Sequence, residues 1–350
     1  MKRKIYCDYL RLLCAFSVVV GHVSGRYWGS VGVSGPLWHT LNFYDSIIRW
    51  CIPAFLMITG ALLIPRDITI KKLYSRYILK IVIVFLFWSL FYAATNHIQQ
   101  GIIDSIKTNL YILATGNFHM WYVLMLFGIY ICYPIIKRIA GDEKVMKYYL
   151  IISFVFAILA PWMIQSFKDF LVYRFDFVEK LIWVIETDLH RIDIKMVLGY
   201  PFYVVLGYYL DKIEMKKKTR MIIYLLSIVG FALTIIQTHM VAQILHYPVE
   251  NYYGAFSIGV FLEALGVFTL FKYHVFKNEK MNRFVSRLSD YNLGAYLVHV
   301  FVFNCLFRYV NTLSFNPILS VPILSFIILV ISFGISAILN QIPIIKKYCV

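Results

Sequence analysis

The first apolar segment of the chain, Tyr6 to Ser24, contains three ionisable side chains: Asp8, Arg11 and His22. Proteins use histidine for proton transfer near neutral pH and arginine for binding anions. In an α-helix, the spacing of Arg11 and His22 places them within about 20° around the axis and about 16 Å apart along it. Both would then face one cavity at different depths. A snorkelling arginine and an interfacial histidine would explain the pattern equally well.

Four more ionisable residues lie within or beside apolar segments: Arg49, Lys80, Glu263 and His299. A charged side chain in a membrane span costs about 2.5 to 3.5 kcal/mol on insertion scales, so it usually has a partner or a function. Glu263 lies deep in its segment, which predicts a carboxyl that is protonated or paired with a buried base. A hydrogen bond between helices explains Glu263 at least as well. For His299, one turn from Tyr296, a structural hydrogen bond is the default.

The composition indicates the environment of these residues. Hydrophobic residues make up 61% of the 350 residues and charged residues 15%, with a mean hydropathy of +0.72. Lipid must therefore contact most of the surface. Because a helical span needs about 20 residues, the sequence predicts an all-α, polytopic integral membrane protein with about ten transmembrane helices in a single domain, residues 1–350. The expected spans are 6–24, 47–64, 81–103, 118–136, 148–167, 196–210, 221–249, 252–271, 291–307 and 316–345.

The positive charge is distributed as a topology signal. With the N-terminus inside, 23 of the 34 Lys and Arg residues fall in the cytoplasmic connections and 8 in the outer ones. Positively charged loops are retained in the cytoplasm, so both termini are predicted to be cytoplasmic. The net charge of +16 does not form an aromatic-interleaved patch, so we expect membrane lipid rather than nucleic acid as a partner.

Signatures of soluble enzymes are missing from the sequence: it contains no P-loop, dinucleotide fingerprint, nucleophile elbow or H-E-x-x-H pattern. The six cysteines are scattered without C-x-x-C spacing, which predicts neither disulfides nor a metal site. The basic segment from Arg66 to Arg76, which includes Lys71 and Lys72, is explained by topology but is also suited to holding phosphates.

Several segments resemble the acyltransferase-3 family of membrane acyltransferases. An Arg followed at this distance by a His, as in Arg11 and His22, is that family's first-span signature. Residues 53–60 resemble its P-x-F-F-M-x-S-G run, 119–123 its H-x-W-F-L pattern, 202–209 the end of its sixth span, and 288–299 its S-x-x-S-x-G-x-Y-L-x-H pattern. The resemblance covers nearly the whole chain and is closest to the short branch that acts on surface polysaccharides.

The resemblance implies that an acyl group, expected to be acetyl from cytoplasmic acetyl-CoA, is transferred to a hydroxyl of a surface or cell-envelope polysaccharide or its lipid-linked precursor. His22 would be the general base or a transient nucleophile. Arg11 would hold the donor or stabilise charge on the thioester oxygen, and Asp8 would orient Arg11. The expected location is a bacterial cytoplasmic membrane.

The donor and acceptor would be bound by further residues. We expect Arg76, Lys80 and Lys72 to contact the phosphates of coenzyme A. Candidate acceptor-binding residues are His119, Trp121, Glu263 and Arg49. Because no extracellular catalytic domain follows the last span, the acceptor would be handled by the membrane domain or delivered by a partner such as the polysaccharide synthesis machinery.

Two departures from the family pattern and two competing functions stand beside this hypothesis. Thr59 occupies a position where the family prefers Ser, and Arg76 is followed by Lys80 at a spacing of four where the family often has two Arg at a spacing of three. A polysaccharide exporter without acyl transfer is the main alternative, although no internal repeat supports a transporter. A purely structural membrane subunit would leave Arg11, His22 and Glu263 without a reason.

Overall fold

A computed structural model describes residues 3–96, 111–171, 182–187 and 199–350 of the chain. These residues form helices joined by turns and loops, with no β-strand among them, which confirms the predicted all-α class. The helices are α1 (Ile5–Trp28), α2 (Pro36–Ser46), α3 (Cys51–Leu63), α4 (Ile70–Lys72), η1 (Leu73–Ile78), α5 (Leu79–Asn96), η2 (Phe118–Met120), α7 (Trp121–Gly141), α8 (Glu143–Ser153), η3 (Phe154–Leu159), α9 (Ala160–Leu171), α11 (Pro201–Lys212), α12 (Lys217–Leu245), α13 (Ile258–Tyr273), α14 (Glu279–Asp290), α15 (Asn292–Leu306), α16 (Pro317–Leu339) and α17 (Pro343–Tyr348).

Each predicted span contains at least one helix among the described residues, although residues 47–50 and 252–257 of two spans lie in turns and bends. Within the described ranges, seven segments are long and apolar enough to cross a membrane. Helices α11, α13 and α15 have 12, 16 and 15 residues, which is short of the usual crossing length. The count of ten therefore remains a prediction, and residues 97–103 and 196–198 of two predicted spans lie outside the described residues. The seven segments are Ile5–Trp28, Pro36–Leu63, Ile70–Thr95, Tyr111–Gly141, Glu143–Leu171, Lys217–Leu245 and Pro317–Leu339.

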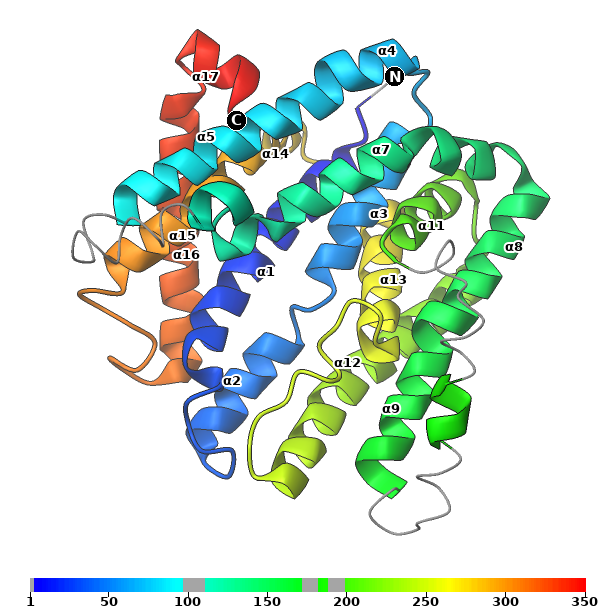
Figure 1. Cartoon of the computed structure of the whole chain (residues 1–350), viewed down its shortest axis with the longest axis vertical. Coiled ribbons are helices and arrows are strands. Elements are labelled where there is room, and N and C mark those ends of the chain that lie inside the picture. The colour runs from blue at the N-terminus through cyan, green and yellow to red at the C-terminus, as the bar shows by residue number, and fades with distance from the viewer. Residues whose placement is uncertain (1–2, 97–110, 172–181, 188–198) are drawn as a thin grey trace.

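Helix α1 lies in the middle of the bundle, where it packs against α2, α3, α13, α14, α15 and α16. Further pairs are α3 with α11, α12 with α13, and α15 with α16 (Figure 1). Both termini lie at the same end of the bundle in Figure 1. The segments predicted to be cytoplasmic also meet there: Lys4 contacts Asp211, and Lys137 contacts Asp67. Which side of the membrane this end faces remains a prediction.

Helices α3 and α11 approach so closely that their contact requires glycine. A Cβ added to Gly60 would lie 1.7 Å from the carbonyl oxygen of Val204, and one added to Gly207 would lie 2.1 Å from that of Met57. Real Cβ atoms do not come within 3.0 Å of such neighbours. Two segments that resemble family motifs, 53–60 and 202–209, thus pack directly on each other.

The second membrane segment is interrupted. Helix α2 ends at Ser46 and α3 begins at Cys51, so residues 47–50 form a turn between them. Pro53 follows in the first turn of α3, where a missing backbone N–H costs no helical hydrogen bond. The sequence prediction placed Ile47 to Ile64 in one span and did not include α2. The break matters because it exposes Arg49 to a cavity.

Candidate active site

The C-terminal half of α1 faces a cavity of about 640 Å³, which we call the histidine cavity. His22 lines it together with His119 from η2 and aromatic side chains from several elements. Phe118 and Trp121 are 65% and 43% exposed, so this cavity is open to the surroundings of the protein. Its other aromatic lining residues are Trp28, Tyr200, Tyr253, Tyr296 and Phe303.

Three histidines from three distant segments meet beside the histidine cavity, which His22 and His119 line. The His22 ring stacks on the His299 ring with centroids 5.1 Å apart, and the His299 ring contacts the His119 ring edge-on at 5.2 Å. Phe118 contacts His22 from the cavity side, with centroids 5.4 Å apart. The sequence favours a structural hydrogen bond for His299, but its proximity to His22 makes it part of the site.

Hydrogen bonds orient two of the three rings. His299 Nδ1 donates to the carbonyl oxygen of Tyr296, so the other ring nitrogen, Nε2, is an acceptor in the neutral ring. That Nε2 is buried and has no hydrogen-bond partner among the described residues. His119 Nε2 lies 3.3 Å from the carbonyl oxygen of Leu297, and its Nδ1 lies 3.2 Å from the side-chain oxygen of Asn117. The structural hydrogen bond expected between His299 and the residue one turn earlier is therefore present, and His299 contacts His22 as well.

The N-terminal half of α1, through Arg11, faces a second cavity of about 580 Å³, which we call the basic cavity. It is lined by Arg11, Lys72, Arg76 and Lys80, so three predicted phosphate-binding residues and Arg11 are brought together. Asp290 is the one carboxylate among the described residues that line it. Arg11 and His22 therefore face two different cavities, at two levels along α1. The single shared cavity expected from their spacing is not present among the described residues.

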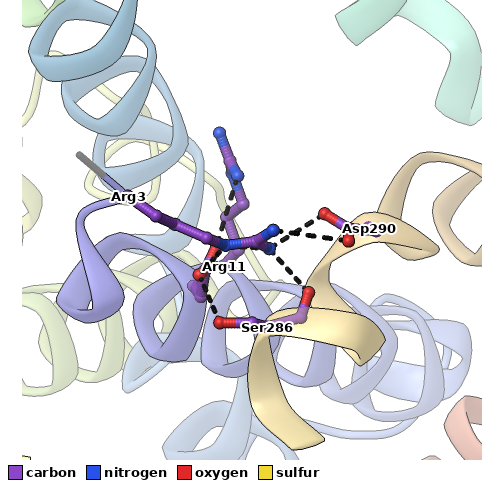
Figure 2. Close-up of polar contacts among 5 residues, drawn as sticks. Arg3, Arg11, Ser286 and Asp290 are labelled. Carbon is purple, nitrogen blue, oxygen red and sulfur yellow. Dashed lines mark hydrogen bonds and ion pairs between the residues drawn. The ribbon is translucent and has the colours of Figure 1, made fainter. Parts of the chain in front are cut away.

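Asp8 interacts more closely with Arg3 and Ser286 than with Arg11. Arg3 Nε donates to Asp8 Oδ2 at 2.6 Å, and the Ser286 hydroxyl donates to the same oxygen at 3.0 Å. Arg11 Nη1 lies 3.6 Å from Asp8 Oδ1, which is an ion pair beyond hydrogen-bond distance. Figure 2 shows Arg3 between α1 and α14, where it also contacts Asp290. The proposed orientation of Arg11 by Asp8 would thus be electrostatic.

Arg3 joins α1 to the carboxylate of the basic cavity. Its Nη2 donates to Asp290 Oδ1 at 2.9 Å and to the carbonyl oxygen of Ser286 at 2.6 Å (Figure 2). The hydrogen bond to Asp8 raises the pKa of Arg3 above its ordinary value, so its guanidinium stays charged. Arg3 thereby offsets the negative charge of Asp290 beside the four cations. In the sequence, Arg3 is one of the positive charges that indicate a cytoplasmic N-terminus.

Arg49 and Asp45 form a buried ion pair on the histidine cavity. An Arg49 Nη2 donor contacts Asp45 Oδ2, Nε donates to the Asp45 carbonyl oxygen at 3.2 Å, and the guanidinium lies 3.9 Å from the centre of the Tyr253 ring. Asp45 is 2% exposed. Asp45 lies outside the span predicted from Ile47 and is therefore not among the predicted site residues; its spacing of four from Arg49 is the signal in the sequence that could have found it.

Of the remaining predicted acceptor-binding residues, two line the histidine cavity and Glu263 does not. Trp121 and His119 line the histidine cavity, and their contact with an acceptor stays a prediction. Glu263 is fully buried in α13, where its Oε1 accepts a hydrogen bond from the Thr234 hydroxyl of α12 at 2.7 Å. It lines neither the histidine cavity nor the basic cavity. This is the helix-to-helix hydrogen bond that the sequence also allowed.

The profile of the acyltransferase-3 family, described as an acyltransferase domain, matches residues 4–339 of the chain. The chain belongs to the acyltransferase-3 family. With its apolar helices, it is a multi-pass membrane acyltransferase. No curated protein and no solved structure matches the chain. Details beyond the family therefore depend on the two cavities and their residues.

Proposed function

We propose that this acyltransferase-3 protein transfers an acetyl group from cytoplasmic acetyl-CoA to a hydroxyl of a cell-envelope polysaccharide or its lipid-linked precursor. The main support for this proposal is that α1 contributes to two cavities: Arg11 lines the basic cavity and His22 lines the histidine cavity. A donor and an acceptor that approach from opposite ends of one helix would meet between these residues. The expected location remains a bacterial cytoplasmic membrane.

The basic cavity has the charge needed for the donor. Arg11, Lys72, Arg76 and Lys80 line it, and Arg3 neutralises the nearby Asp290. Phosphate groups bind strongly to arginine and lysine through charge-assisted hydrogen bonds. Coenzyme A carries phosphates at one end and the thioester at the other. Phosphates at the mouth of this cavity would direct the thioester toward the middle of the bundle.

The histidine cavity has the lining needed for a sugar. The indole of Trp121 and the ring of Tyr200 are adjacent, with centroids 6.1 Å apart. Apolar rings can cover the C–H faces of a sugar, while Asp45, Glu250 and Arg49 can bind its hydroxyls.

His22 can activate the acceptor by either of two routes. In the direct route, a His22 ring nitrogen accepts the hydroxyl proton, the hydroxyl oxygen attacks the thioester carbonyl carbon, and the carbon–sulfur bond breaks. Coenzyme A leaves as a thiolate that takes up a proton. In the covalent route, a His22 ring nitrogen attacks the carbonyl carbon and the carbon–sulfur bond breaks, with coenzyme A leaving as a thiolate that takes up a proton. The hydroxyl oxygen then attacks the acyl carbon, the carbon–nitrogen bond breaks, and the hydroxyl proton is released as neutral His22 is restored. Both routes yield one ester and one thiol.

The decisive experiment measures base-labile O-acyl groups on the surface polysaccharides of the host by NMR. Wild type is compared with His22→Ala and with His39→Ala, a matched control because His39 is exposed and does not line the histidine cavity. All three proteins are first adjusted to equal membrane expression. Esters with wild type and His39→Ala but not with His22→Ala would support the proposal and identify the acceptor.

The same strains distinguish the exporter hypothesis. Equal ester levels in all strains would remove His22 from the mechanism. If polymer export were lost at the same time in a strain lacking the protein, transport would become the better description. Thiol release from acetyl-CoA by the purified protein, supplied with a mixed polysaccharide extract of the host, provides a second reading that does not require the acceptor to be identified.

A further inference from the structure

Tyr296 of α15 occupies the boundary between the two cavities. Among the residues that the structure describes, it alone lines both the basic cavity and the histidine cavity. It also packs against two hydrophobic clusters of the core, one built around α3 and α11 and the other around α15 and α16. The ring therefore lies where the two halves of the interior meet.

The Tyr296 ring is held in place from several sides. Its hydroxyl donates to the carbonyl oxygen of His119, and its own carbonyl oxygen accepts from His299 Nδ1. The ring centroid lies 5.8 Å from that of Tyr122, which lines the basic cavity. It lies 5.8 Å from that of His119, which lines the histidine cavity. One aromatic neighbour on each side and a fixed hydroxyl leave the ring little freedom.

We propose that the Tyr296 ring is the partition between donor and acceptor cavities and sets the length of the acyl group that can be transferred. The proposal rests on the function proposed above for these cavities. An acyl group attached to a donor in the basic cavity must pass this ring to reach His22. The ring therefore limits the room for the acyl chain and separates the thioester from water in the histidine cavity.

A smaller side chain at this position would open the boundary. Water could then reach the thioester, where its oxygen attacks the carbonyl carbon, the carbon–sulfur bond breaks, and a carboxylate, a thiol and a proton are formed. Longer acyl chains would also find room. In a well-fitted apolar pocket, one additional methylene typically changes specificity by about 10-fold to 200-fold. The substitution should reduce such discrimination.

The first arm of the test needs no catalysis. Wild type, Tyr296→Leu, Tyr296→Phe and Tyr77→Leu are reconstituted in proteoliposomes, and glycerol entry is followed by stopped-flow light scattering. Tyr77 is the matched control because it loses the same atoms but lines only the basic cavity. Faster glycerol entry with Tyr296→Leu alone is expected. Equal entry with wild type and Tyr296→Leu, or entry through wild type itself, counts against a partition.

The second arm measures thiol release from acetyl-CoA and butyryl-CoA without acceptor. Tyr296→Leu should hydrolyse acetyl-CoA faster than wild type and should lower the acetyl-to-butyryl preference by about tenfold. Tyr296→Phe retains the ring and should resemble wild type in both measurements. An unchanged hydrolysis rate and an unchanged preference, in protein with a wild-type elution profile, overturn the proposal.

The two arms separate this inference from the proposed function. If wild type transfers no acyl group to the host's polysaccharides but Tyr296→Leu admits glycerol, the acyl-CoA function fails while the partition stands. If wild type is active and Tyr296→Leu changes neither permeability nor donor preference, the partition fails while the function stands. Tyr296→Phe tests the hydroxyl separately, since it removes only the hydrogen bond to the His119 carbonyl oxygen.

Discussion

The proposed donor site makes a quantitative prediction for Arg76. This side chain is exposed and lines the basic cavity, where it would contact a phosphate of coenzyme A. A hydrogen bond to a charged group contributes roughly 1.5 to 3 kcal/mol, and exposure to solvent brings the expected loss down to about 1 to 2 kcal/mol. Since 1.4 kcal/mol corresponds to a factor of ten, Arg76→Gln should raise the Kd for coenzyme A roughly 5-fold to 30-fold.

The assay is isothermal titration of detergent-purified protein with coenzyme A at two salt concentrations. Lys71→Gln is the matched control, since Lys71 is exposed and close in sequence but does not line the basic cavity. It removes the same charge from the same surface without removing a lining side chain. The effect of Arg76→Gln should also shrink at high salt, because ionic contacts at an exposed site are screened.

Two results would refute this reasoning. An unchanged Kd for Arg76→Gln would show that the cavity does not hold the phosphates. Equal losses for Arg76→Gln and Lys71→Gln, both abolished by salt, would show that the basic surface attracts coenzyme A without a specific contact. Coenzyme A lacking its 3′-phosphate identifies the phosphate involved: if Arg76 contacts that group, Arg76→Gln should bind both ligands alike.

Two further predictions concern packing and the histidine cluster. Gly207→Ala should lower thermal stability by at least about 1 to 3 kcal/mol, since the new Cβ would lie 2.1 Å from the Met57 carbonyl oxygen. Gly128→Ala, whose Cβ would meet no atom within 4 Å, should leave the melting temperature unchanged, and similar melting of both variants would contradict the packing. His299→Gln should lower kcat by about tenfold with little change in KM for acyl-CoA, because it removes the ring stacked on His22. A kcat equal to that of wild type would limit His299 to a structural role.

The long-range features of the fold follow from hydropathy, while the site depends on contacts that periodicity does not encode. Apolar runs located a helix at each predicted span, because a membrane requires hydrogen-bonded helices wherever the chain crosses it. The depth of Arg11 and His22 along α1 was also predictable from helix geometry. Their separation into two cavities was not, because the Tyr296 ring between those cavities comes from a helix far along the chain.

The same limit applies to the histidines and to Asp45. His22 and His299 are neighbours through the packing of α1 against α15, and no local pattern links residues so far apart in sequence. The hydrogen bond that made His299 look structural is real, but it explains only one of its two nitrogens. Asp45 was overlooked for a different reason: the break at residues 47–50 places it in a separate helix, α2, that the predicted span did not contain.

The unusual spacing of Arg76 and Lys80 has a structural explanation. Residues Leu73–Ile78 form a π-helical segment, in which the N–H of Leu79 donates to the carbonyl oxygen of Tyr74, five residues earlier. Such a turn holds one more residue than an α-turn, so a spacing of four here can replace the family's spacing of three. Both cations accordingly line the basic cavity.

The two cations nevertheless differ in their availability to a donor. Lys80 Nζ donates to the backbone oxygen of Val350 at 2.8 Å, and the Trp88 indole donates to that of Cys349 at 2.9 Å, so Lys80 already fastens the segment after α17 to α5. Replacing Lys80 would release this segment as well as remove a charge, and a change in donor binding would then have two causes. Arg76 is exposed beside the same cavity, so its replacement tests the phosphate contact with less disturbance of the fold.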